Sequence, residues 1–201
     1  MARKILTRSA LLLLALTLSA CVSLGGGGGK APASLLTLTP SQSAPAGSAT
    51  SATASDALMV MEPETDQSLS VLRVPVQVDD ANIAYLQGAV WVEKPARLFR
   101  ALLAETLRAK TGRLVLEDSQ AIVPASGVRL SGRLIAMGYD ARSGAVVVRF
   151  DAIRTGLDGE VQTKRFEAVV DGVAPSAAEV GPALNKAAND VAGQVAVWMG
   201  S

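Results

Sequence analysis

The chain has 201 residues, a formal net charge of +1, a single cysteine and no histidine. The near-neutral charge gives no reason to expect nucleic acid as a partner. One cysteine excludes an internal disulfide, and the lack of histidine excludes the common catalytic triads and the histidine-containing zinc sites.

Residues 1–20 are typical of a secretory signal peptide. Arg3, Lys4 and Arg8 precede an apolar stretch over 11–18. This stretch is shorter than the roughly 18 to 20 residues that a membrane-spanning helix needs. We therefore expect export of the chain rather than a permanent membrane span.

The sequence LSAC at 18–21 follows the apolar stretch at once and resembles the lipobox of bacterial lipoproteins. In that family the cysteine is acylated and the peptide before it is removed, so the resemblance implies lipidation at Cys21. The alternative is an ordinary signal peptide with an incidental cysteine. In many Gram-negative bacteria an aspartate after the cysteine marks retention at the inner membrane. Val22 stands there instead, which predicts an outer-membrane lipoprotein that faces the periplasm.

Five glycines at 25–29 precede Lys30, but they do not form a phosphate-binding loop. That loop ends in Gly-Lys followed by Ser or Thr, whereas Ala31 follows Lys30 here. We predict a flexible, lipidated tether over 21–33. A second stretch, 41–55, is rich in Ser, Ala and Thr and is predicted to be a mobile loop within the domain 34–201.

The first half of that domain is predicted to contain strands and one helix. Short apolar runs at 34–39, 57–62 and 69–76 indicate strands, and 81–92 indicates one or two strands bent at Gly88. A helix is expected over 95–111, opened by Pro95 and closed by Gly112. Its apolar face is formed by Phe99, Leu102, Leu103 and Leu107.

The second half is predicted to be a meander followed by a helix. Apolar and polar residues alternate over 127–140, 145–153 and 160–170, which is typical of antiparallel strands with one solvated side. The last helix begins with a capping box formed by Ser176 and Glu179. The expected fold is therefore α+β, an antiparallel β-sheet with two amphipathic α-helices packed on one face.

The sequence offers little that could perform catalysis. The adjacent acids Asp79-Asp80 and Glu117-Asp118 are expected to be solvated charges. We therefore predict no catalytic residue, no metal ligand, no cofactor and no enzyme activity. Tyr85 and Trp91 are two of only seven aromatic residues. Core packing is the first interpretation for both, and a partner interface is the alternative.

The block 71–112 resembles the ABC-type transport auxiliary lipoproteins, the PqiC/YmbA-like group. The resemblance rests on a strand with Val71 and Pro75, a strand with Tyr85, and Trp91 shortly before the proline that opens a leucine-rich helix. Together with the lipobox, the meander and the last helix, it spans roughly residues 20–198. One departure is the Trp-to-Pro spacing, which is a residue longer than in the family.

The resemblance implies a non-catalytic part of a lipid-transport system. Its partners would be an MCE-domain protein and an inner-membrane permease and ATPase, and a homo-oligomer is also expected. Arg100 and Arg108 are expected on the polar face of helix 95–111, where a partner could bind and where charge reversal would barely change stability. The alternatives are a structural lipoprotein of outer-membrane protein or lipopolysaccharide assembly, and a periplasmic hydrolase, for which no site is evident.

Overall fold

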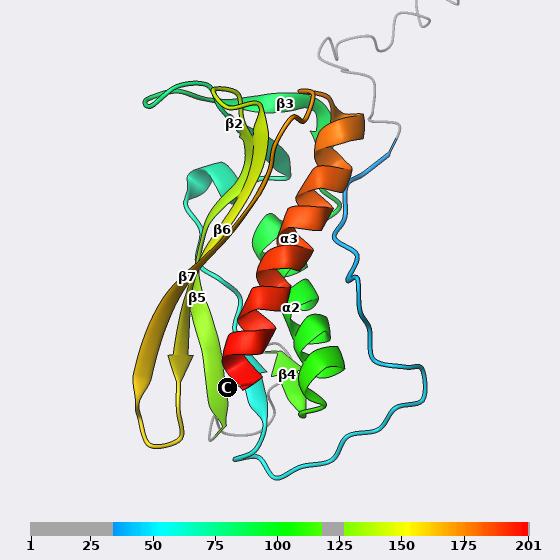
Figure 1. Cartoon of the computed structure of the whole chain (residues 1–201), viewed down its shortest axis with the longest axis vertical. Coiled ribbons are helices and arrows are strands. Elements are labelled where there is room, and N and C mark those ends of the chain that lie inside the picture. Colours follow the sequence, from blue (N-terminus) through cyan, green and yellow to red (C-terminus); the bar gives the residue numbers. More distant parts are fainter. Residues whose placement is uncertain (1–33, 118–126, 201) are drawn as a thin grey trace, which may run out of the picture. The chain divides into compact units, whose positions relative to one another are not determined.

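The computed structural model describes residues 34–117 and 127–200, in which a seven-stranded sheet is covered on one face by two long helices (Figure 1). The α+β class and the position of both helices on one face are confirmed. The predicted signal peptide and the whole predicted tether 21–33, which includes Cys21, lie outside the described residues. In chain order the elements are β1 (Leu58–Val60), the 3-10 helix η1 (Gln67–Leu69), β2 (Arg73–Gln77), β3 (Ile83–Val90), α2 (Pro95–Thr111), β4 (Val115–Glu117), β5 (Val128–Asp140), β6 (Ala145–Thr155), β7 (Val161–Val170) and α3 (Ala177–Gly200).

The sheet is mixed, which corrects the expectation of a wholly antiparallel sheet. The three long strands β5, β6 and β7 form the predicted antiparallel meander. The other edge of β5 is shared by short segments that run parallel to it, namely β1 at its start and β2 at its end. Strand β4 then pairs parallel with β1, and β3 pairs antiparallel with β2. Parallel pairs join segments far apart in the chain, so alternation within one segment does not report them.

Helix α2 begins and ends, and helix α3 begins, where the sequence signals predict. Helix α2 starts at Pro95, and Gly112 follows its last residue in a left-handed conformation with φ of 63°. At the start of α3 the backbone N–H of Glu179 donates to the Ser176 hydroxyl over 3.4 Å. The apolar faces of α2 and α3 meet the strands in one core, where Phe99 packs edge-on against Phe150 with ring centroids 5.3 Å apart.

Two predicted strands differ from the structure, the alternatives for 81–92 are decided, and one strand was not predicted. The run 34–39 forms a single bridge, Leu36 to Trp91, rather than a strand. The run 69–76 becomes a strand only at Arg73, and 81–92 contains one strand in which Gly88 has φ of 71°. Strand β4 was not predicted, because three residues are too few to show a period.

Candidate functional site

The sheet has one face against the two long helices and one face that no long helix covers, which we call the open face. Alternation along β6 separates the two. Val148, Phe150 and Ala152 are buried on the helix side, whereas Arg149 and Asp151 point the other way. Strand β7 follows the same rule in register, with Phe166 opposite Phe150 and Arg165 opposite Asp151. The open face is therefore polar at its centre.

Two cross-strand ion pairs occupy the centre of the open face. The Arg165 guanidinium donates to both carboxylate oxygens of Asp151, at 2.5 Å from Nε and 2.6 Å from Nη2. Arg149 donates to Glu167 in the neighbouring pair. The hydrogen bonds from Arg165, with further help from Arg149 and Arg133, hold the pKa of the Asp151 carboxyl below its ordinary value. Asp151 is therefore ionised at neutral pH and matched to Arg165.

A hollow of about 790 Å³ lies on the open face beside these pairs. It is bounded by the segment 61–64, which follows β1, and by β5, β6 and β7. Its lining residues are Met61, Glu62, Glu64, Arg129, Ser131, Gly132, Arg133, Asp151, Ala152, Ile153, Thr163, Lys164 and Arg165. None of them was singled out by sequence reasoning. The alternating polar positions of β5 were the available signal, but they did not reveal which strands would enclose a depression.

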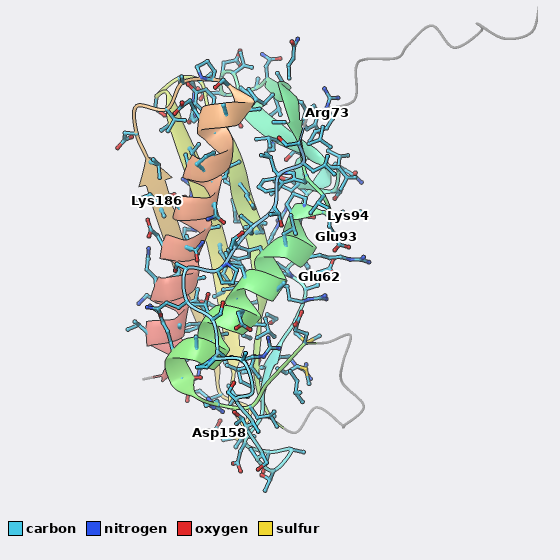
Figure 2. All side chains as sticks on the ribbon, turned by 90° about the vertical axis from the view of Figure 1, so that its right-hand side faces the viewer. Glu62, Arg73, Glu93, Lys94, Asp158 and Lys186 are labelled. Atoms are coloured by element: carbon cyan, nitrogen blue, oxygen red, sulfur yellow. The ribbon has the colours of Figure 1, made fainter. Side chains whose placement is uncertain are left out.

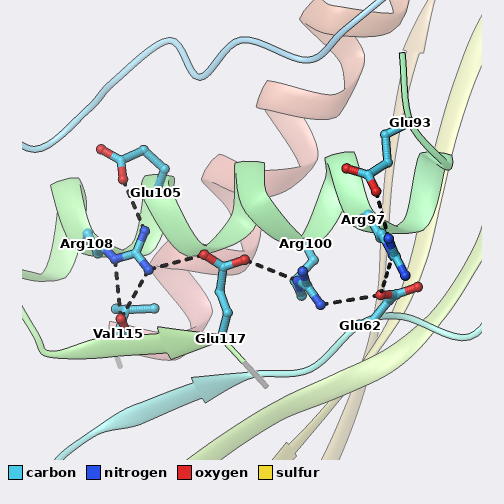
Figure 3. A network of polar contacts seen from close by, with 8 residues as sticks. All are labelled: Glu62, Glu93, Arg97, Arg100, Glu105, Arg108, Val115 and Glu117. Atoms are coloured by element: carbon cyan, nitrogen blue, oxygen red, sulfur yellow. Dashed lines mark hydrogen bonds and ion pairs between the residues drawn. The ribbon is translucent and has the colours of Figure 1, made fainter. Parts of the chain in front are cut away.

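Arg100 and Arg108 lie elsewhere, between α2 and the β1–β4 side of the sheet. Figure 3 shows an alternating chain of charges in which Glu62 bridges Arg97 and Arg100, and Glu117 bridges Arg100 and Arg108. The Arg100 side chain is 13% exposed and that of Glu117 is 14% exposed. The expectation that Arg100 and Arg108 lie on a solvated face is therefore wrong.

The physical reason is the unpredicted strand β4. It places Glu117 under α2, and Arg108 also donates to the Val115 main-chain oxygen, at 3.3 Å from Nε and 3.2 Å from Nη2. These contacts join the helix to the sheet. Binding of a partner by Arg100 and Arg108 stays a prediction, but their present partners are within the domain.

Tyr85 and Trp91 have different environments. The Tyr85 ring is partly buried on β3, and the Arg73 guanidinium lies 4.5 Å from its centre in a cation–π contact. Trp91 is 1% exposed and belongs to the core. Its indole N–H donates no hydrogen bond within the described residues. A partner could reach Tyr85 on the folded domain but not Trp91, so core packing is the correct interpretation for Trp91.

The chain enters the domain through an extended segment, residues 36–44, which we call the strap. Leu36 exchanges two main-chain hydrogen bonds of 2.8 Å with Val90 and Val92. Its side chain fills the space where Gly181 of α3 has no Cβ, because a Cβ there would lie 2.7 Å from the Leu36 side chain. The strap thus starts on the helix side of the sheet (Figure 1).

Two asparagines on α3 hold the middle of the strap. The Asn185 side chain accepts from the Thr39 N–H over 2.8 Å. Asn189 accepts from the Ser41 N–H over 2.7 Å and donates to the Thr39 oxygen over 2.9 Å. The Ala44 N–H then donates to Glu105 of α2 over 2.8 Å. The mobility predicted for 41–55 stays a prediction, but its first residues are bonded to both helices.

The acids that the sequence analysis expected to be solvated have other environments. Asp118 lies outside the described residues, and Glu117 is paired with Arg100 and Arg108 rather than solvated. The Asp79 carboxylate accepts from the N–H groups of Ala81 and Asn82, which closes the β2–β3 turn and lowers the pKa of Asp79. Asp80 pairs with Arg142. Among residues 34–117 and 127–200, no group of three or more Cys, Asp or Glu side chains could hold a metal ion. No helix within these ranges has the length and apolar character needed to cross a membrane.

Neither a family model nor a curated protein matches this sequence. Among solved structures, one described as an uncharacterised protein is similar with a TM-score of 0.62 and 15% identity, over 71% of this chain and 91% of that one. Protein XCC0632 from Xanthomonas campestris, described with the family model DUF330, has a TM-score of 0.61 and 17% identity, over 84% of this chain and 92% of its own. At such identities the similarity establishes a shared fold.

Proposed function

We propose that this protein is an outer-membrane lipoprotein, anchored through Cys21, that acts as the non-catalytic docking component of an ABC-type, MCE-linked phospholipid transport system. The observation that carries the proposal is the open face of the sheet. It is an uncovered surface of cross-strand charge pairs on a domain whose chain enters on the opposite, helix-covered side. A partner can therefore reach this surface without displacing the strap.

Three further points support the proposal. The lipobox-like sequence before Cys21 gives the anchor, and Val22 favours the outer membrane. Asp80, Asp151 and Glu167 are paired with arginines and Asp79 closes a turn, so these acids are not prepared for acid–base chemistry. The resemblance of the block 71–112 to the auxiliary lipoproteins suggests the MCE-linked system as the partner. A ring of several copies would be compatible with such a docking role.

The anchor is tested by metabolic labelling with palmitate. The wild-type chain should incorporate label and fractionate with the outer membrane, and Cys21→Ser should abolish the label because no other cysteine exists. Label that persists in Cys21→Ser would overturn the lipoprotein assignment. Recovery of the wild type with the inner membrane would overturn the location alone.

The docking role is tested by co-purification with an MCE-domain protein of the same organism. Arg165→Glu places a repelling charge against Asp151 on the open face and should reduce capture at least about tenfold. Lys186→Glu is the matched control, since Lys186 is exposed on the helix side (Figure 2). Capture by β-barrel assembly components in place of the MCE-domain protein would favour the assembly-factor alternative and contradict the transport role.

A further inference from the structure

The floor of the hollow includes a position of β5 that passes too close to β6 for any side chain. Gly132 of β5 has φ of 145°, and a Cβ at this position would lie 2.0 Å from the Asp151 main-chain oxygen on β6. Glycine is therefore required here. Ala152 lies beside it on β6, directly opposite in the strand register. Neither residue places a side chain in the hollow, since Gly132 has none and Ala152 is buried on the helix side.

Two arginines flank this floor on β5. Arg129, Ser131 and Arg133 alternate with Leu130 and Leu134, which are buried on the helix side, so all three point to the open face. Arg129 and Arg133 are four residues apart, which corresponds to about 13 Å between their Cα atoms. Flexible arginine side chains can converge across that distance above the Ser131 hydroxyl.

These two guanidiniums differ from the other arginines around them. Arg149 and Arg165 on the same face are committed to Glu167 and Asp151. Within the described residues, the Arg129 and Arg133 guanidiniums form no ion pair and no side-chain hydrogen bond. Arg133 is opposite Asp151 in the register, but Arg165 already occupies both oxygens of that carboxylate.

The remaining charges leave the hollow cationic. Of its three carboxylates, Asp151 is held by Arg165, and Glu62 is held by Arg97 and Arg100. Glu64, the third, lies beside Arg133 as its partner in an isolated parallel β-bridge. The lining still holds four basic and three acidic side chains, so its net charge is positive. Lys164 adds a further positive charge on β7, with its Nζ 5.2 Å from the centre of the Phe166 ring. Two neighbouring guanidiniums beside a hydroxyl can bind an anion that has several acceptor oxygens. Phosphate is such an anion, and its oxygens match the planar, forked N–H donors of arginine.

We propose that Arg129, Ser131 and Arg133 form a binding site for the phosphate group of a ligand that enters this hollow. The site goes beyond the docking role and does not depend on it. The ligand can be inorganic phosphate or the head group of a phospholipid. Partly exposed Ile153 and Met61 lie at the same hollow and offer apolar surface to the glycerol and first acyl carbons of a lipid.

The test is calorimetric titration of the full chain in nonionic detergent with inorganic phosphate and with water-soluble dibutyryl-phosphatidylglycerol. We expect binding in the millimolar range or tighter, which weakens with added salt. The double variant Arg129→Gln/Arg133→Gln should weaken it by about tenfold or more, because each charge-assisted hydrogen bond contributes strongly. Lys186→Gln/Arg142→Gln removes the same charge outside the hollow and should change affinity less than about twofold.

The outcomes separate the two sources of phosphate. Equal affinity for the two probes identifies inorganic phosphate as sufficient, and tighter binding of the phosphatidylglycerol identifies a lipid head group. Arg133→Lys keeps the charge but loses the donor fork, so it should bind with intermediate affinity if the double variant does not fold. The proposal is overturned if neither probe binds the wild type, or if the double variant, folded by circular dichroism, binds both as the wild type does.

Discussion

The two faces of the sheet are built from the same strands but have different tasks. On the helix side, Phe150 and Phe166 meet in register within a core shared with α2 and α3. At the next pair of positions in this antiparallel ladder, Asp151 and Arg165 meet on the open face as an ion pair. Burial on the helix side determines the fold, whereas exposed pairs contribute little to stability. The open face can therefore be specialised for binding without loss of the fold, and the two faces should respond differently to substitution.

The largest effect is expected from Leu103→Ala on the helix side. Leu103 is fully buried in α2, so the substitution should lower the free energy of unfolding by about 2–5 kcal/mol through lost burial and a cavity. Thermal and denaturant unfolding measure this loss. Val197→Ala is the control, since Val197 on α3 is 71% exposed and its truncation should change stability by less than about 0.5 kcal/mol. Equal losses would contradict the assignment of the covered face.

A smaller loss is expected from Arg100→Glu at the junction of α2 with β4. The new carboxylate would face Glu62 and Glu117 in a site that is mostly screened from water, so stability should fall by about 1–3 kcal/mol. Arg97→Glu, at a side chain that is 54% exposed, should cost less than about 1 kcal/mol. The comparison uses denaturant unfolding at low and high salt. An Arg100→Glu variant that is as stable as the wild type would mean that the network does not hold the helix to the sheet.

The smallest effect is expected from Asp151→Asn on the open face, and it should depend on pH. Folding lowers the pKa of Asp151 below the ordinary value of 3.8, so the ionised carboxylate stabilises the fold above that value and loses its effect as the pH falls through the folded-state pKa. Near neutral pH the variant should be less stable by about 0.2–1 kcal/mol. The gap between variant and wild type should narrow below about pH 4. A gap that stays constant from pH 7 to about pH 2 would show that the pair is not responsible.

Local signals predicted the elements that depend on neighbouring residues. Pro95 and Gly112 gave both ends of α2, and Ser176 with Glu179 gave the start of α3, because caps act within one turn. The alternation of apolar and polar residues predicted β5, β6 and β7. The strict alternation fails at one place in β5. Leu134 and Met137 are three positions apart and yet both buried, because the pairing with β6 shifts register between Leu134 and Ala136.

Features that depend on distant residues were not predictable in this way. The partners of Arg100 come from β4 and from the end of β1, up to 38 residues away. A helical pattern shows that Arg100 is off the apolar face but not that another strand covers it. The hollow likewise requires Arg129, Ser131 and the segment 61–64 to be neighbours, and only the parallel pairing of β1 with β5 brings them together.

The strap has a mechanical consequence for a domain held by its N-terminal end. Tension applied before Ser34 would first load the two main-chain bonds of Leu36, and then the bonds to Asn185, Asn189 and Glu105 in turn. Since these bonds would be loaded one after another, each resists with only about 1 kcal/mol, and the strap should peel away before the core is strained. Release of the strap, residues 36–44, would add about 30 Å of extended chain. The strap would thus act as an extensible tether. The domain would stay close to its point of attachment at rest and could move farther from it under tension.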